Sequence, residues 1–181
     1  MSHHDLPDHG QGFDGFGLTD PGWLPRGGSA PIGPMRLVFL GVLQALVLLA
    51  VVVVFALPVT PDDGAIDPIG WALAGLSVPA AAAGIVVGRR PLSTPSLAAF
   101  RTRMFLGIAL ADAAALVGFM AAFVAEAAVL YLATGAIGVL TLLAIAPTDA
   151  RLRADDLALQ RQGQNASVRA EAYGAPPMGT R

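Results

Sequence analysis

Carboxylates are the residues of this chain best suited to do chemistry, and one of them stands inside a long apolar segment. Asp112 lies near the middle of the stretch from Arg101 to Glu126, whose interior is otherwise apolar or small. An isolated carboxylate in such a place holds a proton, binds a cation, or hydrogen-bonds to a neighbouring helix. The sequence therefore makes Asp112 the candidate for a proton- or ion-binding site.

Other chemistry is sparse. The chain has no cysteine, and its three histidines all fall within the first nine residues, so none stands in an apolar segment. No phosphate-binding Gly loop and no Ser–His arrangement is present. Glu126 and Tyr131, with the acidic loop of Asp62, Asp63 and Asp67, resemble no catalytic site. We therefore expect a protein that is not an enzyme, without catalytic residues, metal or cofactor, in which Glu126 and Tyr131 lie at a membrane interface.

The composition favours a membrane protein. Of the 181 residues, 55% are hydrophobic and 13% charged, whereas about a quarter are charged in a typical soluble domain. The apolar residues form runs long enough to cross a bilayer. We predict an all-α membrane protein with four transmembrane helices arranged as two antiparallel hairpins. The predicted spans are residues 35–57, 70–88, 104–124 and 127–146.

The flanking segments are polar. Residues 1–34 are rich in Gly, Pro, Asp and His, which predicts a disordered N-terminal tail. Thr148 or Asp149 is placed to cap a short amphipathic helix reaching about Gln162, and residues 163–181 are expected to be disordered. Residues 148–181 thus form a cytoplasmic helix and tail.

The arginines predict the orientation. They lie before the first span, between the second and third, and after the fourth, whereas the two remaining connections carry only acidic charge. Because short Arg-rich loops stay in the cytoplasm, both termini are predicted to be cytoplasmic. The use of Arg without Lys, together with much Ala, Gly and Pro, is typical of a GC-rich bacterium. The expected location is the inner membrane of such a cell.

Small residues predict how the spans pack. Gly84 and Gly88 form a Gly-x-x-x-Gly pair, and Gly107, Ala111 and Gly118 surround Asp112 at helical spacing. Pro79 removes a backbone donor inside the second span and should free the carbonyl near Gly75, with Ser77 as a compensating donor. Asp112 is expected to face the bundle, either as a proton or cation site or as a structural group bonded to Ser77 or to the freed carbonyl.

The residues from Arg103 to Asp112 resemble the carboxylate-bearing second helix of the ATP synthase proteolipid, the c subunit. That resemblance implies that Asp112 carries a proton or sodium ion. The chain differs in having Pro79 where the family's first helix has a regular glycine repeat, and in having two further spans. It also resembles uncharacterised bacterial four-span integral membrane proteins, on Leu116–Phe119 and on Pro147 followed by Thr148.

We expect the chain to act as a non-catalytic accessory or scaffold subunit of a larger membrane complex. The alternative is proton or sodium translocation through Asp112 in a proteolipid-like oligomer. The expected partners are the lipid bilayer and either other membrane subunits or further copies of the chain, and no nucleic acid.

Overall fold

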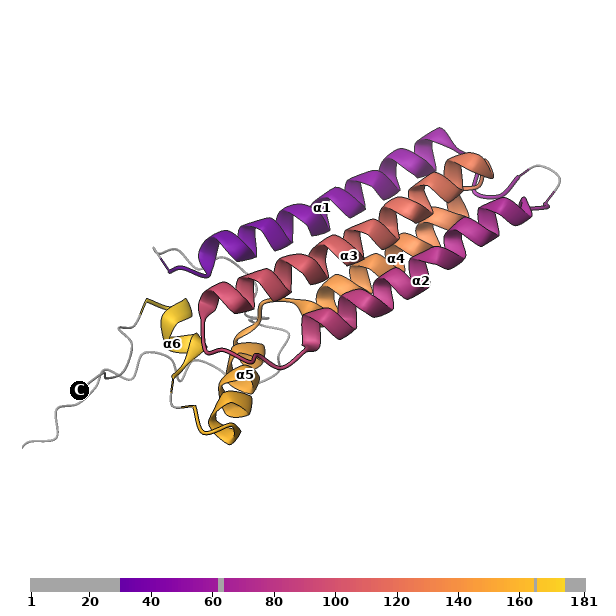
Figure 1. Cartoon of the computed structure of the whole chain (residues 1–181). Helices are drawn as coiled ribbons and strands as arrows, with labels where there is room; N and C mark the ends of the chain where they lie inside the picture. Colours follow the sequence, from indigo (N-terminus) through magenta and orange to yellow (C-terminus); the bar gives the residue numbers. More distant parts are fainter. Residues whose placement is uncertain (1–29, 62–63, 165, 175–181) are drawn as a thin grey trace, which may run out of the picture.

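The computed structural model describes residues 30–61, 64–164 and 166–174, and within them the chain forms helices and no strand (Figure 1). The helices are α1 (Gly33–Ala56), α2 (Pro68–Arg89), α3 (Leu97–Val124), α4 (Ala128–Ile145), α5 (Asp149–Arg161) and α6 (Val168–Ala172). The first four are long and apolar enough to cross a membrane. They correspond to the four predicted spans, which confirms the fold class.

Local sequence explains where the helices begin and end. The side chains of Asp67, Ser96 and Thr148 accept a hydrogen bond from the first turns of α2, α3 and α5, as N-cap residues do. Prolines lie just beyond the ends of α1, α2 and α4, where the chain no longer needs a backbone donor. The predicted cap of the amphipathic helix is therefore Thr148.

The hairpin of α3 and α4 lies between α1 and α2 (Figure 1). Both α1 and α2 pack on α3 and α4, but they do not contact each other. Packing is most extensive between α2 and α3 and between α3 and α4, and α1 is the most loosely attached of the four. Consecutive spans are antiparallel. The predicted hairpin of α1 and α2 is open, because α3 and α4 lie between these two helices.

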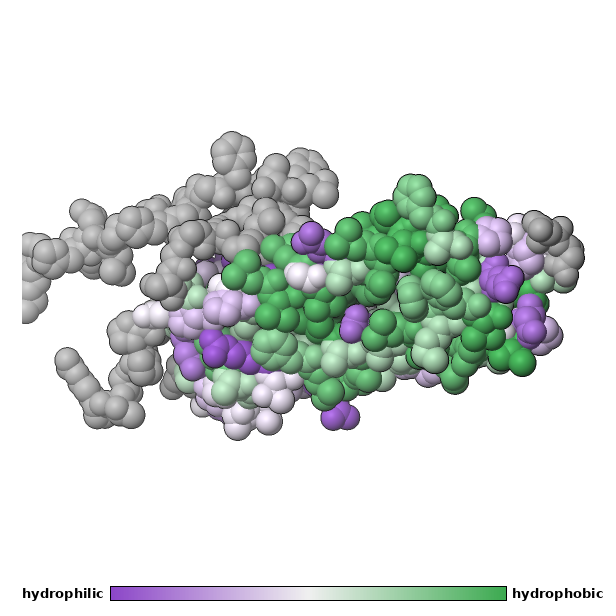
Figure 2. Space-filling view, turned by 90° about the horizontal axis from the view of Figure 1, so that it is seen from above, coloured by the Kyte–Doolittle hydropathy of each residue, from purple (hydrophilic) through white to green (hydrophobic). Residues whose placement is uncertain are grey.

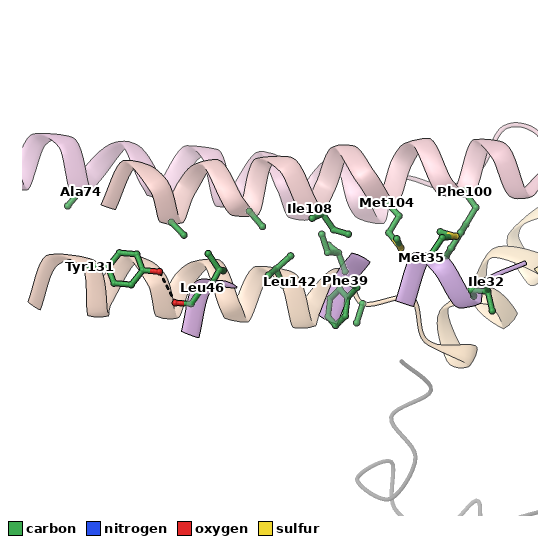
Figure 3. Close-up of a cluster of buried hydrophobic side chains, with 14 of the residues drawn as sticks. Ile32, Met35, Phe39, Leu46, Ala74, Phe100, Met104, Ile108, Tyr131 and Leu142 are labelled. Atoms are coloured by element: carbon green, nitrogen blue, oxygen red, sulfur yellow. Dashed lines mark hydrogen bonds between the residues drawn. The ribbon is translucent and has the colours of Figure 1, made fainter. Parts of the chain in front are cut away.

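Side chains from α1 attach it to the bundle (Figure 3). Met35, Phe39 and Leu46 are buried. Met35 lies near Phe100 and Met104 of α3, whereas Leu46 lies beside Tyr131 of α4. Most of the remaining surface of α1 is exposed and apolar. Such a surface suits lipid, because hydrocarbon tails are as apolar as Leu or Val.

The outside of the molecule has the polarity profile of a membrane-spanning bundle. Figure 2 shows an apolar surface along the length of the bundle and hydrophilic residues toward both ends. At one end lie α5, α6 and all nine arginines that the structure describes, and at the other lie Asp67 and Glu126. The four long helices fit a small multi-pass membrane protein.

Two terminal segments differ from the sequence-based expectation. Ile32, assigned to the disordered tail, is 1% exposed, and its N–H donates to the Ala172 carbonyl at 3.2 Å. Part of the segment expected to be disordered after Gln162 forms α6, whose Val168 and Ala172 are fully buried. The rest of the predicted N-terminal tail, residues 1–29, lies outside the described part of the chain.

The third span also begins earlier than predicted. Ser96 caps α3, so Arg101 and Arg103 belong to its first two turns rather than to a loop. The 28 residues of α3 extend for about 42 Å at ~1.5 Å per residue, which exceeds the ~30 Å of bilayer hydrocarbon. The first turns of α3 therefore project beyond the apolar layer, where arginines are readily accommodated.

Candidate functional site

Asp112 lies near the middle of α3, fifteen residues after Leu97 and twelve before Val124. At ~1.5 Å per residue it is about 22 and 18 Å from the two ends of the helix. In a bilayer that covers the four long helices, this position would lie deep in the hydrocarbon layer.

The carboxylate stands at the edge of the inward face of α3. Its neighbour Ala111 and the next-turn residue Ala115 are completely buried, whereas Ala109 and Leu116 are exposed. Asp112 is only partly buried. Its side chain therefore faces the outer side surface of the bundle, its flank, as well as the interior. The sequence did not predict this position.

Asp112 forms no hydrogen bond or ion pair with any residue that the structure describes. The Ser77 hydroxyl donates to the Ala74 carbonyl at 2.6 Å instead. The expected hydrogen bond from Asp112 to Ser77 or to the Gly75 carbonyl is thus not formed. The reason is the direction of the side chain, since Gly107 faces α2 and Asp112 lies about 140° farther around the helix at ~100° per residue.

Two aromatic residues, one on α3 and one on α4, lie on the Asp112 side. Asp112 is within electrostatic range of Tyr131, and Phe119, two turns further along α3, packs edge-on against the Tyr131 ring with centroids 5.9 Å apart. The Tyr131 hydroxyl donates to the Leu46 carbonyl of α1 at 2.9 Å (Figure 3). The charge of Asp112 thus acts on the residue of α4 that bonds to α1.

Tyr131, expected at a membrane interface, is fully buried in the bundle, in the first turn of α4. Its ring lies over Gly135, where an added Cβ would be 3.3 Å from the ring carbon Cζ. Glu126, in contrast, is exposed in the turn between α3 and α4, with a φ of 48°. The two residues therefore do not form a common site.

The small residues that flank Asp112 in sequence serve the opposite face of its helix. A Cβ at Gly84 would lie 3.2 Å from the Gly107 carbonyl, and one at Gly107 would lie 3.3 Å from the Gly88 Cα. Gly118 leaves room for Thr134 of α4. Pro79 is exposed on α2, which continues as one helix past it. Packing of α2, α3 and α4 therefore depends on this Gly-rich face.

Sequence reasoning missed a polar cluster at the arginine-rich end of the bundle. The Arg103 guanidinium forms two hydrogen bonds with the Asp155 carboxylate of α5, and both side chains are about nine-tenths buried. The sequence contains a signal for this cluster, because Asp155 lies three residues after Leu152 and four before Leu159, on the apolar face of α5. Leu157, which lies off that face, is 53% exposed.

A second missed network fixes α6. Arg36 donates to the Tyr173 hydroxyl at 3.1 Å, and that hydroxyl donates to Asp149. Burial acts to raise the pKa of Asp149, but the hydrogen bond from Tyr173 and the charge of Arg169 outweigh it, so this pKa lies below 3.8. Glu171 accepts a hydrogen bond from the Leu97 N–H at 2.8 Å. The polar groups of α6 therefore bind the first turns of α1 and α3.

The chemistry open to Asp112 is limited. Among the residues that the structure describes, no group of three His, Cys, Asp or Glu side chains converges on a common point. A single carboxylate can hold a proton, bind a monovalent cation, or accept hydrogen bonds from a donor brought by another chain. The fold and this site together describe a small polytopic membrane protein with one carboxylate open to its flank.

Comparison with protein-family models, with curated proteins and with solved structures finds no match to this chain. The function is therefore inferred from the geometry alone.

Proposed function

We propose that the protein is a non-catalytic accessory or scaffold subunit that docks onto another membrane subunit through the flank containing Asp112. One observation carries this proposal: the carboxylate is partly exposed at mid-depth and has no partner among the described residues. An ionised carboxylate at the bilayer centre costs at least about 2.5 kcal/mol. A polar hydrogen-bond donor of a neighbouring subunit would offset that cost.

The charge distribution supports a cytoplasmic location for the end that carries α5 and α6. All nine described arginines lie at that end, and Arg-rich segments stay on the cytoplasmic side. We therefore place both termini in the cytoplasm. The composition supports the inner membrane of a GC-rich bacterium as the proposed location.

The test compares three variants of the full chain, extracted from its native membrane in a mild detergent. Asp112→Leu removes the polar group, Asp112→Asn keeps its hydrogen-bonding capacity, and Gln44→Leu removes an exposed polar side chain from α1 as a matched control. Quantitative mass spectrometry measures the ratio of any co-purified membrane subunit. We expect a fixed ratio for the wild type and for the Gln44 and Asn variants, and loss of the subunit with Leu. Equal recovery from all four proteins contradicts the proposal.

The alternative is proton or sodium translocation, and the partial exposure of Asp112 favours it too. A carboxylate at the flank can exchange its proton or ion with an adjacent subunit without opening the bundle. This function requires carbodiimide labelling of Asp112 that slows with sodium or at high pH. It also requires that Asp112→Asn abolish ion flux in proteoliposomes, whereas an accessory subunit keeps its assembly with that substitution.

A further inference from the structure

A pocket of about 330 Å³ opens where the ends of α2 and α4 meet the start of α5. Its polar lining comes from Arg89, Thr148, Arg151 and Asp155, and its apolar lining includes Leu143 and Ala144. Since α2 and α4 end here, the pocket lies where a membrane-spanning bundle meets the lipid headgroups. The pocket lies at the arginine-rich end of the bundle, whereas Asp112 lies near the middle of α3.

Positive charge exceeds negative charge around this pocket. The charge of Arg151 interacts with the charges of Arg89 and Arg103 and with one carboxylate, that of Asp155. Asp155 is already paired with Arg103 in the buried ion pair. Neither Arg89 nor Arg151 forms an ion pair with a carboxylate in the described part of the chain. Burial and then the charges of Arg103 and Arg89 lower the pKa of Arg151 to about 10, so it remains charged at neutral pH. An anion in the pocket would relieve this repulsion.

The guanidinium groups of Arg89 and Arg151 are hydrogen-bonded to backbone carbonyls and still have N–H donors for a ligand. Arg151 donates to the carbonyls of Gly88 and Ala144, and the Arg89 Nε donates to the Ala144 carbonyl at 3.4 Å. These bonds satisfy carbonyls at the C-terminal ends of α2 and α4 that lack helical partners. A guanidinium has five N–H groups, so the terminal nitrogens of Arg89 keep theirs for a ligand. The positive N-terminal end of α5, which Thr148 caps, adds to the positive field in the pocket.

The surface next to the pocket suits an acyl chain. Helices α2 and α4 contact each other and lead away from the pocket. Their exposed apolar side chains include Val86 of α2 and Leu140 and Leu143 of α4. A free inorganic anion would use only the arginines. A phospholipid would use the arginines through its phosphate and the apolar flank through its hydrocarbon.

We propose that this pocket binds the phosphate group of an acidic phospholipid. Two arginines that are hydrogen-bonded to backbone carbonyls recognise the phosphate with planar sets of donors, as guanidinium groups do. The site would fasten the C-terminal ends of α2 and α4, and through Arg151 also α5, to the headgroup layer. The inference does not depend on which subunit meets Asp112.

The test measures thermal unfolding of the full chain in a non-ionic detergent during titration with phosphatidylglycerol, phosphatidylcholine or inorganic phosphate. Arg89→Gln is the deciding variant, because Arg89 is exposed and makes one long hydrogen bond, so the variant should fold. Arg153→Gln is the matched control. It removes an arginine of α5 that is 58% exposed and that pairs with Asp149 outside the pocket.

We expect phosphatidylglycerol to raise the unfolding temperature more than phosphatidylcholine does. One arginine near a membrane surface is worth about a fivefold change in affinity for anionic lipid. The apparent affinity should therefore fall about fivefold in Arg89→Gln, should not change in Arg153→Gln, and should weaken with added salt. Equal affinities in all three proteins would overturn the proposal. If inorganic phosphate stabilises the protein through Arg89 and phosphatidylglycerol does not, the pocket binds a free anion, and the proposal of a lipid ligand is overturned.

Discussion

Arg103 and Asp155 are 52 residues apart and join α3 to α5 by an ion pair that solvent barely reaches. The Arg103 guanidinium also donates to the Arg90 carbonyl at the end of α2. Arg103 therefore joins the start of α3 to the end of α2 and to α5.

Asp155→Ala should destabilise the fold strongly, because it leaves the Arg103 charge buried without its partner. Loss of one member of a buried pair costs about 3–5 kcal/mol. The double variant Arg103→Met with Asp155→Leu should recover much of that loss, since an apolar pair needs no desolvation. Unfolding temperatures in detergent measure both, and a double variant less stable than the single one would contradict the explanation.

Gly118→Ala should also destabilise the bundle. An added Cβ would overlap the Thr134 side chain of α4, and forcing extra volume into a packed interior costs about 1–3 kcal/mol. Gly75→Ala is the matched control, because nothing lies within 4 Å of a Cβ at that position of α2. The control should unfold no earlier than the wild type. Equal unfolding temperatures for the two variants would show that α3 and α4 adjust at no cost.

Glu126→Gly should stabilise the protein by about 1 kcal/mol. The φ of 48° at Glu126 is left-handed, a conformation that a residue with a Cβ adopts at a cost of roughly 1–2 kcal/mol and glycine adopts freely. Glu126→Ala separates this effect from the charge, since it removes the carboxylate and keeps the Cβ. It should leave the unfolding temperature near that of the wild type. A gain with Ala as large as the gain with Gly would assign the effect to the carboxylate.

Acid should release α6 before it unfolds the bundle. Because the pKa of Asp149 is lower in the folded protein than in the unfolded chain, its contribution to stability is present above about pH 4. That contribution is lost as the pH falls through the folded value. Hydrogen exchange at Val168–Ala172 should therefore increase below about pH 4 in the wild type. In Asp149→Asn the exchange should be fast already at neutral pH, and slow exchange there would rule out the carboxylate as the anchor.

The spans were predictable from the sequence because a bilayer demands long apolar runs with satisfied backbone groups. The contact between Gly84 and Gly107 was predictable for a similar reason, since small residues let membrane helices approach closely. The position of Asp112 at the edge of α3 was not. A membrane helix is apolar on every side, so its sequence lacks the polar stripe that marks the outer face of a soluble helix.

The C-terminal segment was missed for a different reason. α6 has only five residues, too few to form a stable helix alone, and its sequence is polar. It is ordered by contacts with distant residues, such as the Ile32 N–H and the Leu97 N–H. No local pattern records those contacts.

The hydrogen bond between Ile32 and Ala172 joins the start of the first membrane helix to the last helix that the structure describes. During synthesis α1 enters the bilayer first, without α2 as a packing partner, and its own apolar surface must keep it there. It acquires its final partners only after the chain has crossed the membrane three more times and α6 has left the ribosome. The start of α1 therefore reaches its last contact late, and a chain truncated before Val168 would lose the bond to Ala172 while α1 keeps its packing on α3 and α4.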